Sequence, residues 1–209
     1  MVLETKNLTK SYGRKKVLSE VNMHIDRGEI YGFIGQNGAG KTTLMKIVCG
    51  LAKQTGGEFT LYPSAAKAGK ENSIGCVIEQ PALFPNMNGM DNLKYYAKLN
   101  GSEKTTDLSG LLQMVGLGND GRLKTKRYSL GMKQRLSIAI AMLGEPELLV
   151  LDEPMNGLDP MGIKEFRELF LRLKEQGVTL LIASHILGEL EKISTKYGII
   201  TKFVLVDEF

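Results

Sequence analysis

One short stretch of this 209-residue chain constrains its fold more than any other. It reads Gly35-Gln36-Asn37-Gly38-Ala39-Gly40-Lys41-Thr42-Thr43 and fits the spacing G-x-x-x-x-G-K-[S/T], with an apolar run at 30–34 before it and a helix-like stretch at 42–49 after it. Glycines let successive backbone N–H groups turn toward an anion, and the following helix directs the positive end of its dipole to the same place. The stretch predicts a phosphate-binding loop, in which Lys41 contacts the β- and γ-phosphates and Thr42 holds Mg²⁺. A glycine-rich turn without a ligand is the simpler alternative.

A second apolar run ends in two acids. Residues 147–154 read Glu-Leu-Leu-Val-Leu-Asp-Glu-Pro, which is the pattern of a buried parallel strand that delivers Asp152 and Glu153 to the carboxyl edge of a sheet. In a phosphate-loop protein such an aspartate orders Mg²⁺, and an adjacent acid polarises the attacking water. We therefore expect Asp152 to bind the metal and Glu153 to act on the water. Two solvated acids at a strand end are the alternative.

Two more residues are candidates for the same site. The apolar run at 178–183 ends at Ser184 and His185, on the same predicted edge, so we expect His185 to contact the γ-phosphate. Tyr12 precedes the phosphate loop on an early β segment, where its ring is placed to stack on an adenine base. A partly buried packing tyrosine explains Tyr12 about as well. We assign no chemistry to His24.

The remaining patterns predict an α/β fold. An antiparallel β region covers residues 2–34, and further strands are expected at 56–62 and 74–78, with a surface loop at 64–72 between them. Apolar residues recur at helical spacing over 86–143, which indicates a helical insert between two strands. In its first helix Leu93, Tyr96 and either Ala97 or Leu99 should face the core. A terminal hairpin is expected at 197–206.

Two helix starts can be read from their caps. Ser129 is placed to cap the helix that runs to residue 143, and Asp159 is placed to cap the next long helix, with Pro160 in its first turn.

Composition excludes several other classes of protein. The net charge of +4 is spread along the chain, whereas a nucleic-acid-binding surface needs clustered positive charge. The N-terminus lacks the pattern of a signal peptide, and no apolar run approaches the ~20 residues that span a bilayer, so any membrane role must come through a partner. Cys49 and Cys76 lie in apolar runs and are expected to be buried free thiols, which suits a reducing cytoplasm.

In this order the segments resemble the nucleotide-binding subunit of ABC transporters over almost the whole chain. The family's Walker A motif falls on 35–43, its Walker B motif on 148–152, its catalytic glutamate on Glu153, its D-loop on 156–159, its switch histidine on His185 and its base-stacking aromatic residue on Tyr12. The resemblance implies a P-loop NTPase core with a RecA-like, mostly parallel sheet and an N-terminal antiparallel β subdomain, over 1–85 and 144–209. It also implies an inserted α-helical subdomain, over 86–143.

Two family motifs are present with departures. The stretch Tyr128-Ser129-Leu130-Gly131-Met132 resembles the signature L-S-G-G-Q with three changes. It keeps Ser129 and Gly131, which in the family reach across a dimer interface to the γ-phosphate bound by the other subunit. Asp159 of the D-loop is expected to be a further nucleotide-binding residue. Glu79 aligns with the glutamine of the family's Q-loop and would contact Mg²⁺, although Gln80 is one residue away and the choice stays open. This acid and the surrounding run 74–87 are similar to the bacitracin and lantibiotic export subgroup.

The resemblance implies an ATPase that uses ATP and Mg²⁺. Two copies would sandwich two ATP molecules as a homodimer and power a transmembrane permease at the inner face of the cell membrane, with no nucleic acid involved. A soluble ABC-type ATPase acting on ribosomes or nucleic acid is the alternative, but such relatives usually carry tandem cassettes or a long coiled-coil insertion, and neither occurs in these 209 residues. A GTP-dependent switch is disfavoured because the N-K-x-D motif that reads guanine is missing.

Overall fold

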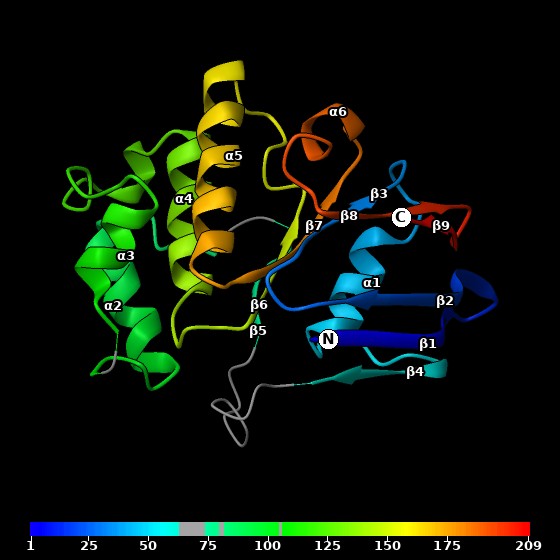
Figure 1. Cartoon of the computed structure of the whole chain (residues 1–209). Helices are drawn as coiled ribbons and strands as arrows, with labels where there is room; N and C mark the ends of the chain where they lie inside the picture. Colours follow the sequence, from blue (N-terminus) through cyan, green and yellow to red (C-terminus); the bar gives the residue numbers. More distant parts are fainter. Residues whose placement is uncertain (63–73, 80–81, 105) are drawn as a thin grey trace.

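The computed structural model describes residues 1–62, 74–79, 82–104 and 106–209 (Figure 1). The surface loop expected at 64–72 and Gln80 lie outside these residues. Within the described ranges, no helix is long and apolar enough to cross a membrane.

An antiparallel sheet of three strands opens the chain, as predicted, but the prediction that the antiparallel region extends over 2–34 is wrong at its end, because residues 30–34 form a strand of the parallel central sheet. Its order is β2-β1-β4, formed by β1 (Leu3–Tyr12), β2 (Lys15–Ile25) and β4 (Gly56–Leu61). Leu3 lies opposite Ile25 on one side and Leu61 on the other. Val21, Met23 and Ile25 alternate with exposed residues along β2 and are buried, because successive side chains of a strand point to opposite faces.

A six-stranded sheet forms the centre of the molecule. Its order is β5-β6-β7-β3-β8-β9, and its strands are β3 (Ile30–Ile34), β5 (Ile74–Val77), β6 (Leu148–Asp152), β7 (Thr179–Ser184), β8 (Lys196–Thr201) and β9 (Val204–Glu208). Every neighbouring pair is parallel except β8 and β9, which form the predicted terminal hairpin. Ile34 pairs with Ser184, and Asp152 pairs with Ala183, so β3, β6 and β7 end at one edge of the sheet.

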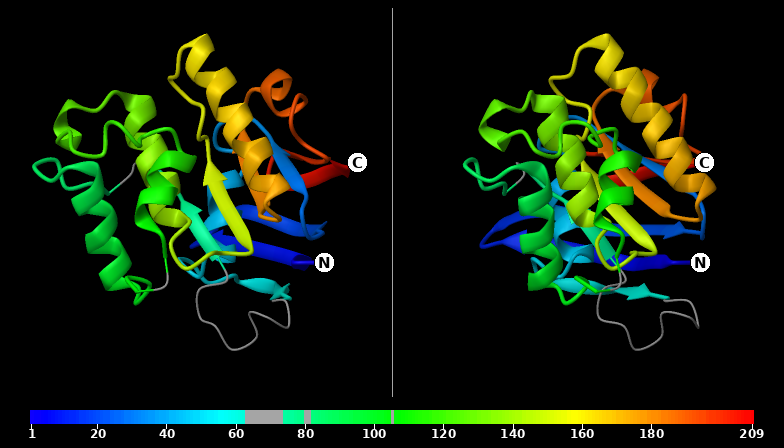
Figure 2. Two further views of the ribbon diagram at one scale, coloured as in Figure 1. Left: turned by 60° about the vertical axis from the view of Figure 1, so that its left-hand side comes forward. Right: turned by 90° about the vertical axis from the view of Figure 1, so that its left-hand side faces the viewer.

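The helices of the insert at 86–143 lie together as one group, and the other helices pack elsewhere on the two sheets (Figures 1 and 2). α1 (Lys41–Val48) contacts β2 of the first sheet and β6 of the second. The insert between β5 and β6 contains α2 (Gly89–Leu99), α3 (Leu108–Met114), a 3₁₀ turn (Thr125–Arg127) and α4 (Leu130–Ala141). α4 contacts α2, α3 and β5. α5 (Pro160–Glu175) covers β7, and the short α6 (Leu187–Leu190) follows it.

The buried face of α2 decides between two residues that the sequence left open. Leu93 and Ala97 are fully buried and Tyr96 is half-buried, whereas Leu99 is 70% exposed. Residues four positions apart lie on the same face of a helix, so Ala97 continues the stripe that Leu93 begins. Leu99 lies two positions further, on the solvent side.

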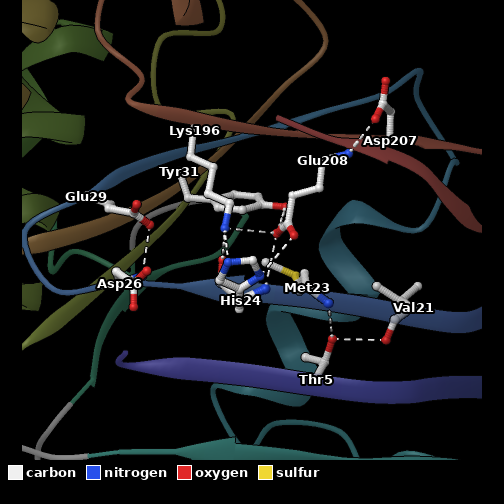
Figure 3. A network of polar contacts seen from close by, with 10 residues as sticks. All are labelled: Thr5, Val21, Met23, His24, Asp26, Glu29, Tyr31, Lys196, Asp207 and Glu208. Carbon is white, nitrogen blue, oxygen red and sulfur yellow. Dashed lines mark hydrogen bonds and ion pairs between the residues drawn. The ribbon is translucent and has the colours of Figure 1, made fainter.

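A polar network holds the C-terminal hairpin against β2 and β3 (Figure 3). The Tyr31 hydroxyl donates to Glu208 Oε1 at 3.0 Å, and His24 Nδ1 lies 3.0 Å from Glu208 Oε2. Lys196 Nζ lies 2.5 Å from His24 Nε2 and donates to the His24 carbonyl at 3.1 Å. Because an ammonium group can only donate, Nε2 accepts and Nδ1 carries the ring proton. Burial, followed by the charge of Glu208, raises the pKa of Tyr31 above its ordinary value.

Candidate active site

The phosphate-binding loop connects β3 to α1, as predicted. Gly40 stands immediately before α1 with φ of 113°, and a Cβ atom there would lie 2.6 Å from the Val17 carbonyl oxygen. Only glycine fits this position, because L side chains rarely adopt such a backbone conformation and the space is taken. A cavity of about 180 Å³ opens at the loop and is lined by Lys15, Val17, Asn37, Gly38, Gly40, Lys41, Thr42, Thr43, Asp152, Glu153 and Phe203. Gly35 and Ala39 belong to the same loop but are not among the residues that line this cavity.

Lys41 is held at this cavity by the loop itself. Its side chain is only 5% exposed, and its Nζ atom donates to the carbonyl oxygens of Gly35 at 2.6 Å and Gln36 at 3.3 Å. The same Nζ atom lies 3.3 Å from Glu153 Oε1. A buried ammonium group needs such partners, and phosphate oxygens would serve as well.

Thr42, in the first turn of α1, contacts Asp152, the last residue of β6. The Thr42 hydroxyl donates to Asp152 Oδ2 at 2.6 Å, while Asp152 Oδ1 is buried and has no hydrogen-bond partner within the described residues. Burial raises the pKa of Asp152, and the nearby charge of Glu153 adds to this, against the hydrogen bond from Thr42. A hydroxyl beside a desolvated carboxylate oxygen that lacks a partner fits a hard cation such as Mg²⁺.

Glu153 is fixed between two predicted site residues. Its Oε2 atom lies 2.8 Å from His185 Nδ1, and its Oε1 atom forms the 3.3 Å ion pair with Lys41 without hydrogen-bond geometry. Its backbone has φ of 49° and donates to the Ala183 carbonyl at 3.0 Å. A left-handed conformation of a residue other than glycine costs roughly 1–3 kcal/mol, and such strain is concentrated at functional sites. The structure thus brings Lys41, Glu153 and His185 together.

Glu79 follows β5 and lies near these acids. Its carboxylate pairs with Lys46 of α1 at 2.6 Å, and this hydrogen bond raises the pKa of Lys46. Glu79 also lines a cleft of about 640 Å³ together with Asp152 and Glu153. Lys46 therefore competes with Mg²⁺ for the Glu79 carboxylate in the predicted contact.

Tyr12 is the last residue of β1, and its aromatic ring is exposed to solvent. The side chain is 53% exposed, and the Lys10 ammonium group lies 4.6 Å from the ring centre. An exposed fraction of about half is also compatible with the alternative, a partly buried packing tyrosine. A stacking role stays a prediction.

The chain matches the family described as ABC transporter over residues 18–156. This chain belongs to the ABC transporter family. It is 44% identical to the bacitracin transport ATP-binding protein BcrA of Enterococcus faecalis, over 99% of this chain and 68% of that protein. It is also 44% identical to the lantibiotic transport ATP-binding protein SrtF of Streptococcus pyogenes, over 100% of this chain and 91% of that protein.

Solved structures agree with this assignment. The ATP-binding subunit of an ABC transporter superposes with a TM-score of 0.84 at 28% identity, over 100% of this chain and 90% of the other. A dimeric bacterial ABC transporter cassette shares the fold, with a TM-score of 0.83 at 23% identity, over 99% of this chain and 97% of that one. The fold is that of a P-loop NTPase cassette, and the chain is an ATP-binding ATPase subunit of the family. The ribosome or nucleic-acid alternative gains no support from these relatives.

In this cassette the signature segment lies apart from the phosphate cavity. Ser129 caps α4 as predicted, since its hydroxyl accepts from the Met132 N–H at 3.2 Å. A Cβ atom on Gly131 would lie 3.3 Å from Leu158, and Asp159 caps α5 through the Gly162 N–H at 2.9 Å. Among the described residues that line the 180 Å³ cavity, none is Ser129, Gly131 or Asp159.

Three residues of the cavity escaped the sequence analysis. Lys15 and Val17 come from β2, and Phe203 comes from the turn between β8 and β9, where its φ is 73°. The Ser19 N–H donates to the Phe203 carbonyl at 2.8 Å and fixes that turn beside β2. No local pattern marks these residues, because pairing over long sequence distances brings them to the loop.

Proposed function

We propose that this cassette hydrolyses Mg²⁺·ATP as a homodimer and powers a transmembrane permease that transports a peptide antibiotic. The proposed hydrolysis rests on the position of the Glu153 carboxylate, which lies between Lys41 and His185 at the phosphate cavity. A carboxylate held in this way is oriented toward the place where the γ-phosphate and the attacking water would meet.

Each residue has a role in this proposal. Lys41 binds the β- and γ-phosphates, and Glu153 accepts a proton from the attacking water. His185, oriented by Glu153, contacts the γ-phosphate. Thr42 and Asp152 would hold Mg²⁺, which supplies charge neutralisation on the phosphate oxygens, and Glu79 would contact the ion or its water. Tyr12 would stack on the adenine through its exposed ring.

The homodimer is supported by the position of the signature segment. Ser129 and Gly131 lie outside the phosphate cavity of their own copy, so a second copy would have to present them to the ATP. Asp159 would lie near the same interface. The fold shared with a dimeric cassette supports this arrangement.

The names of the relatives support the proposed permease and its cargo. Both relatives at 44% identity are transport ATP-binding proteins, one for bacitracin and one for a lantibiotic. The cassette would sit at the inner face of the cell membrane, attached through its permease.

Expression in a sensitive bacterium tests this function. The cassette is produced together with a candidate permease from its own genome, and growth is measured against bacitracin and against a lantibiotic. We expect higher resistance to one of them, lost with Glu153→Gln, and the cassette in the membrane fraction. Unchanged sensitivity with the cassette in the membrane fraction would contradict the cargo, and a cassette found with ribosomes would contradict the permease.

A further inference from the structure

Two thiols lie where the helix of the phosphate loop ends. Cys49 is the C-cap residue of α1 and is half-buried, whereas Cys76 lies on β5 and is exposed. The expectation of two buried thiols is therefore wrong for Cys76. The reason is its place on β5, which is an edge strand of the central sheet.

The register of β5 directs Cys76 toward α1. A Cβ atom on Gly75 would lie 2.0 Å from the Ala141 carbonyl oxygen, so this side of the strand faces α4. Side chains alternate along a strand, and Cys76 consequently points to the opposite face. Ile74 and Ile78, two positions away on that same face, pack against the apolar cluster that Cys49 also contacts.

The end of α1 lies beside β5: Lys46 of α1 pairs with Glu79 after β5 at 2.6 Å, and Leu51, two residues after Cys49, lines one cavity with Cys76. The hydrogen bond from Cys49 lowers the pKa of Cys76 to about 7, although burial acts against it. The same bond, with burial, raises the pKa of Cys49. The thiolate is the reactive form of cysteine, so Cys76 is reactive near neutral pH while Cys49 keeps its proton. Cys76 also lines a cavity of about 230 Å³ with Leu51 and Tyr96, which gives a small molecule access.

We propose that Cys76 and Cys49 form an oxidisable dithiol, which a hydroperoxide converts into a disulfide between β5 and α1. The Cys76 thiolate attacks the outer peroxide oxygen and the O–O bond breaks, leaving a sulfenic acid on Cys76 and releasing water or an alcohol after uptake of one proton. The Cys49 sulfur then attacks the Cys76 sulfur, the S–O bond breaks, and hydroxide leaves with the Cys49 proton as water. The two thiols lose two electrons and the peroxide gains them.

The disulfide would restrict the nucleotide site. α1 begins with Lys41 and Thr42, and β5 runs into Glu79, which already pairs with Lys46 across the same boundary. A covalent bond between α1 and β5 would hinder movement of Glu79 away from Lys46. We expect slower ATP hydrolysis in the oxidised protein, and this consequence rests on the proposed role of Glu79.

Peptide mapping by mass spectrometry tests the dithiol. The reduced chain is treated with hydrogen peroxide, and we expect an intramolecular Cys49–Cys76 disulfide that dithiothreitol reverses. Cys49→Ser should leave a sulfenic acid on Cys76 that dimedone traps, and Cys76→Ser should leave Cys49 reduced. The rate of Cys76 alkylation should rise through about pH 7 in the wild type and at higher pH in Cys49→Ala, which leaves no side-chain hydrogen-bond donor at that position.

Two results would overturn the proposal. One is that both thiols stay reduced under peroxide that oxidises free glutathione, and the other is equal alkylation of Cys76 in the wild type and in Cys49→Ala across the pH range. Both serine variants should hydrolyse ATP at the wild-type rate and keep that rate in peroxide. If the oxidised wild type hydrolyses ATP at its full rate, the proposed effect on the nucleotide site is wrong. If the serine variants are inactive under reducing conditions, the claim that the thiols take no part in catalysis is wrong.

Discussion

At the scale of single residues, Lys41 has the clearest energetic role. Its ammonium group is almost fully buried, forms an ion pair with Glu153 and donates to two loop carbonyls, so it is preorganised for an anion. Lys41→Ala should nearly abolish ATP binding. Isothermal calorimetry measures this, with Lys164→Ala on the exposed face of α5 as the control that keeps its affinity. Wild-type affinity in Lys41→Ala would show that the site is misassigned.

Glu79 makes a separate prediction about the metal. A carboxylate adds a negative charge beside the triphosphate, and Thr42 and Asp152 remain to hold the ion without it. Glu79→Gln should keep ATP binding and most of the hydrolysis, while the Mg²⁺ concentration for half-maximal activity shifts. Parallel Mg²⁺ titrations of the ATPase rate compare it with Gln80→Ala. A shift confined to Gln80→Ala would reassign the Q-loop by one residue.

At the scale of elements, the contact between β5 and α4 allows no extra atom. A Cβ atom on Gly75 would lie 2.0 Å from the Ala141 carbonyl oxygen and 3.0 Å from Pro146, which are groups that cannot move aside easily. Gly75→Ala should destabilise the fold by about 1–3 kcal/mol through overpacking. Thermal denaturation measures it against Gly188→Ala, where a Cβ atom meets nothing within 4 Å. Equal melting temperatures for the two variants would refute the tight contact.

Elements with strong local signals could be predicted from the sequence. β3, β6 and β7 are continuous apolar runs buried on both faces, and Ser129 and Asp159 are caps that act within one turn of their helices. These segments set the strand edge that carries the candidate site.

The rest depends on contacts between distant segments. Cys76 is exposed because β5 lies at the sheet edge, and Phe203 reaches the phosphate cavity because its turn packs beside β2. His24 has no distinctive neighbours in sequence, yet it meets Glu208 across the molecule. Local periodicity carries no information on such pairings, so these residues could not be placed.

At the scale of the whole molecule, the proposed mechanism makes the nucleotide site of one copy incomplete. The signature segment lies outside the phosphate cavity, so closure on ATP requires two copies in this account. Glu153→Gln should accumulate as a dimer with ATP and Mg²⁺, because the bound nucleotide is not consumed. Size-exclusion chromatography with and without ATP measures this, in the presence of the permease if the isolated cassette stays monomeric. A cassette that is monomeric with ATP and permease together would contradict the sandwich.

Hydrolysis by Glu153→Gln tests the central claim most directly. The amide keeps the size of the side chain but cannot accept the proton from water, and a positioned general base contributes roughly 10²–10⁴-fold to a rate. ATP affinity and single-turnover hydrolysis are measured on the same purified variant. We predict wild-type affinity with hydrolysis slower by that factor. A variant that binds ATP and hydrolyses it at the wild-type rate would contradict the role of Glu153, and with it the catalytic arrangement of Lys41, Glu153 and His185.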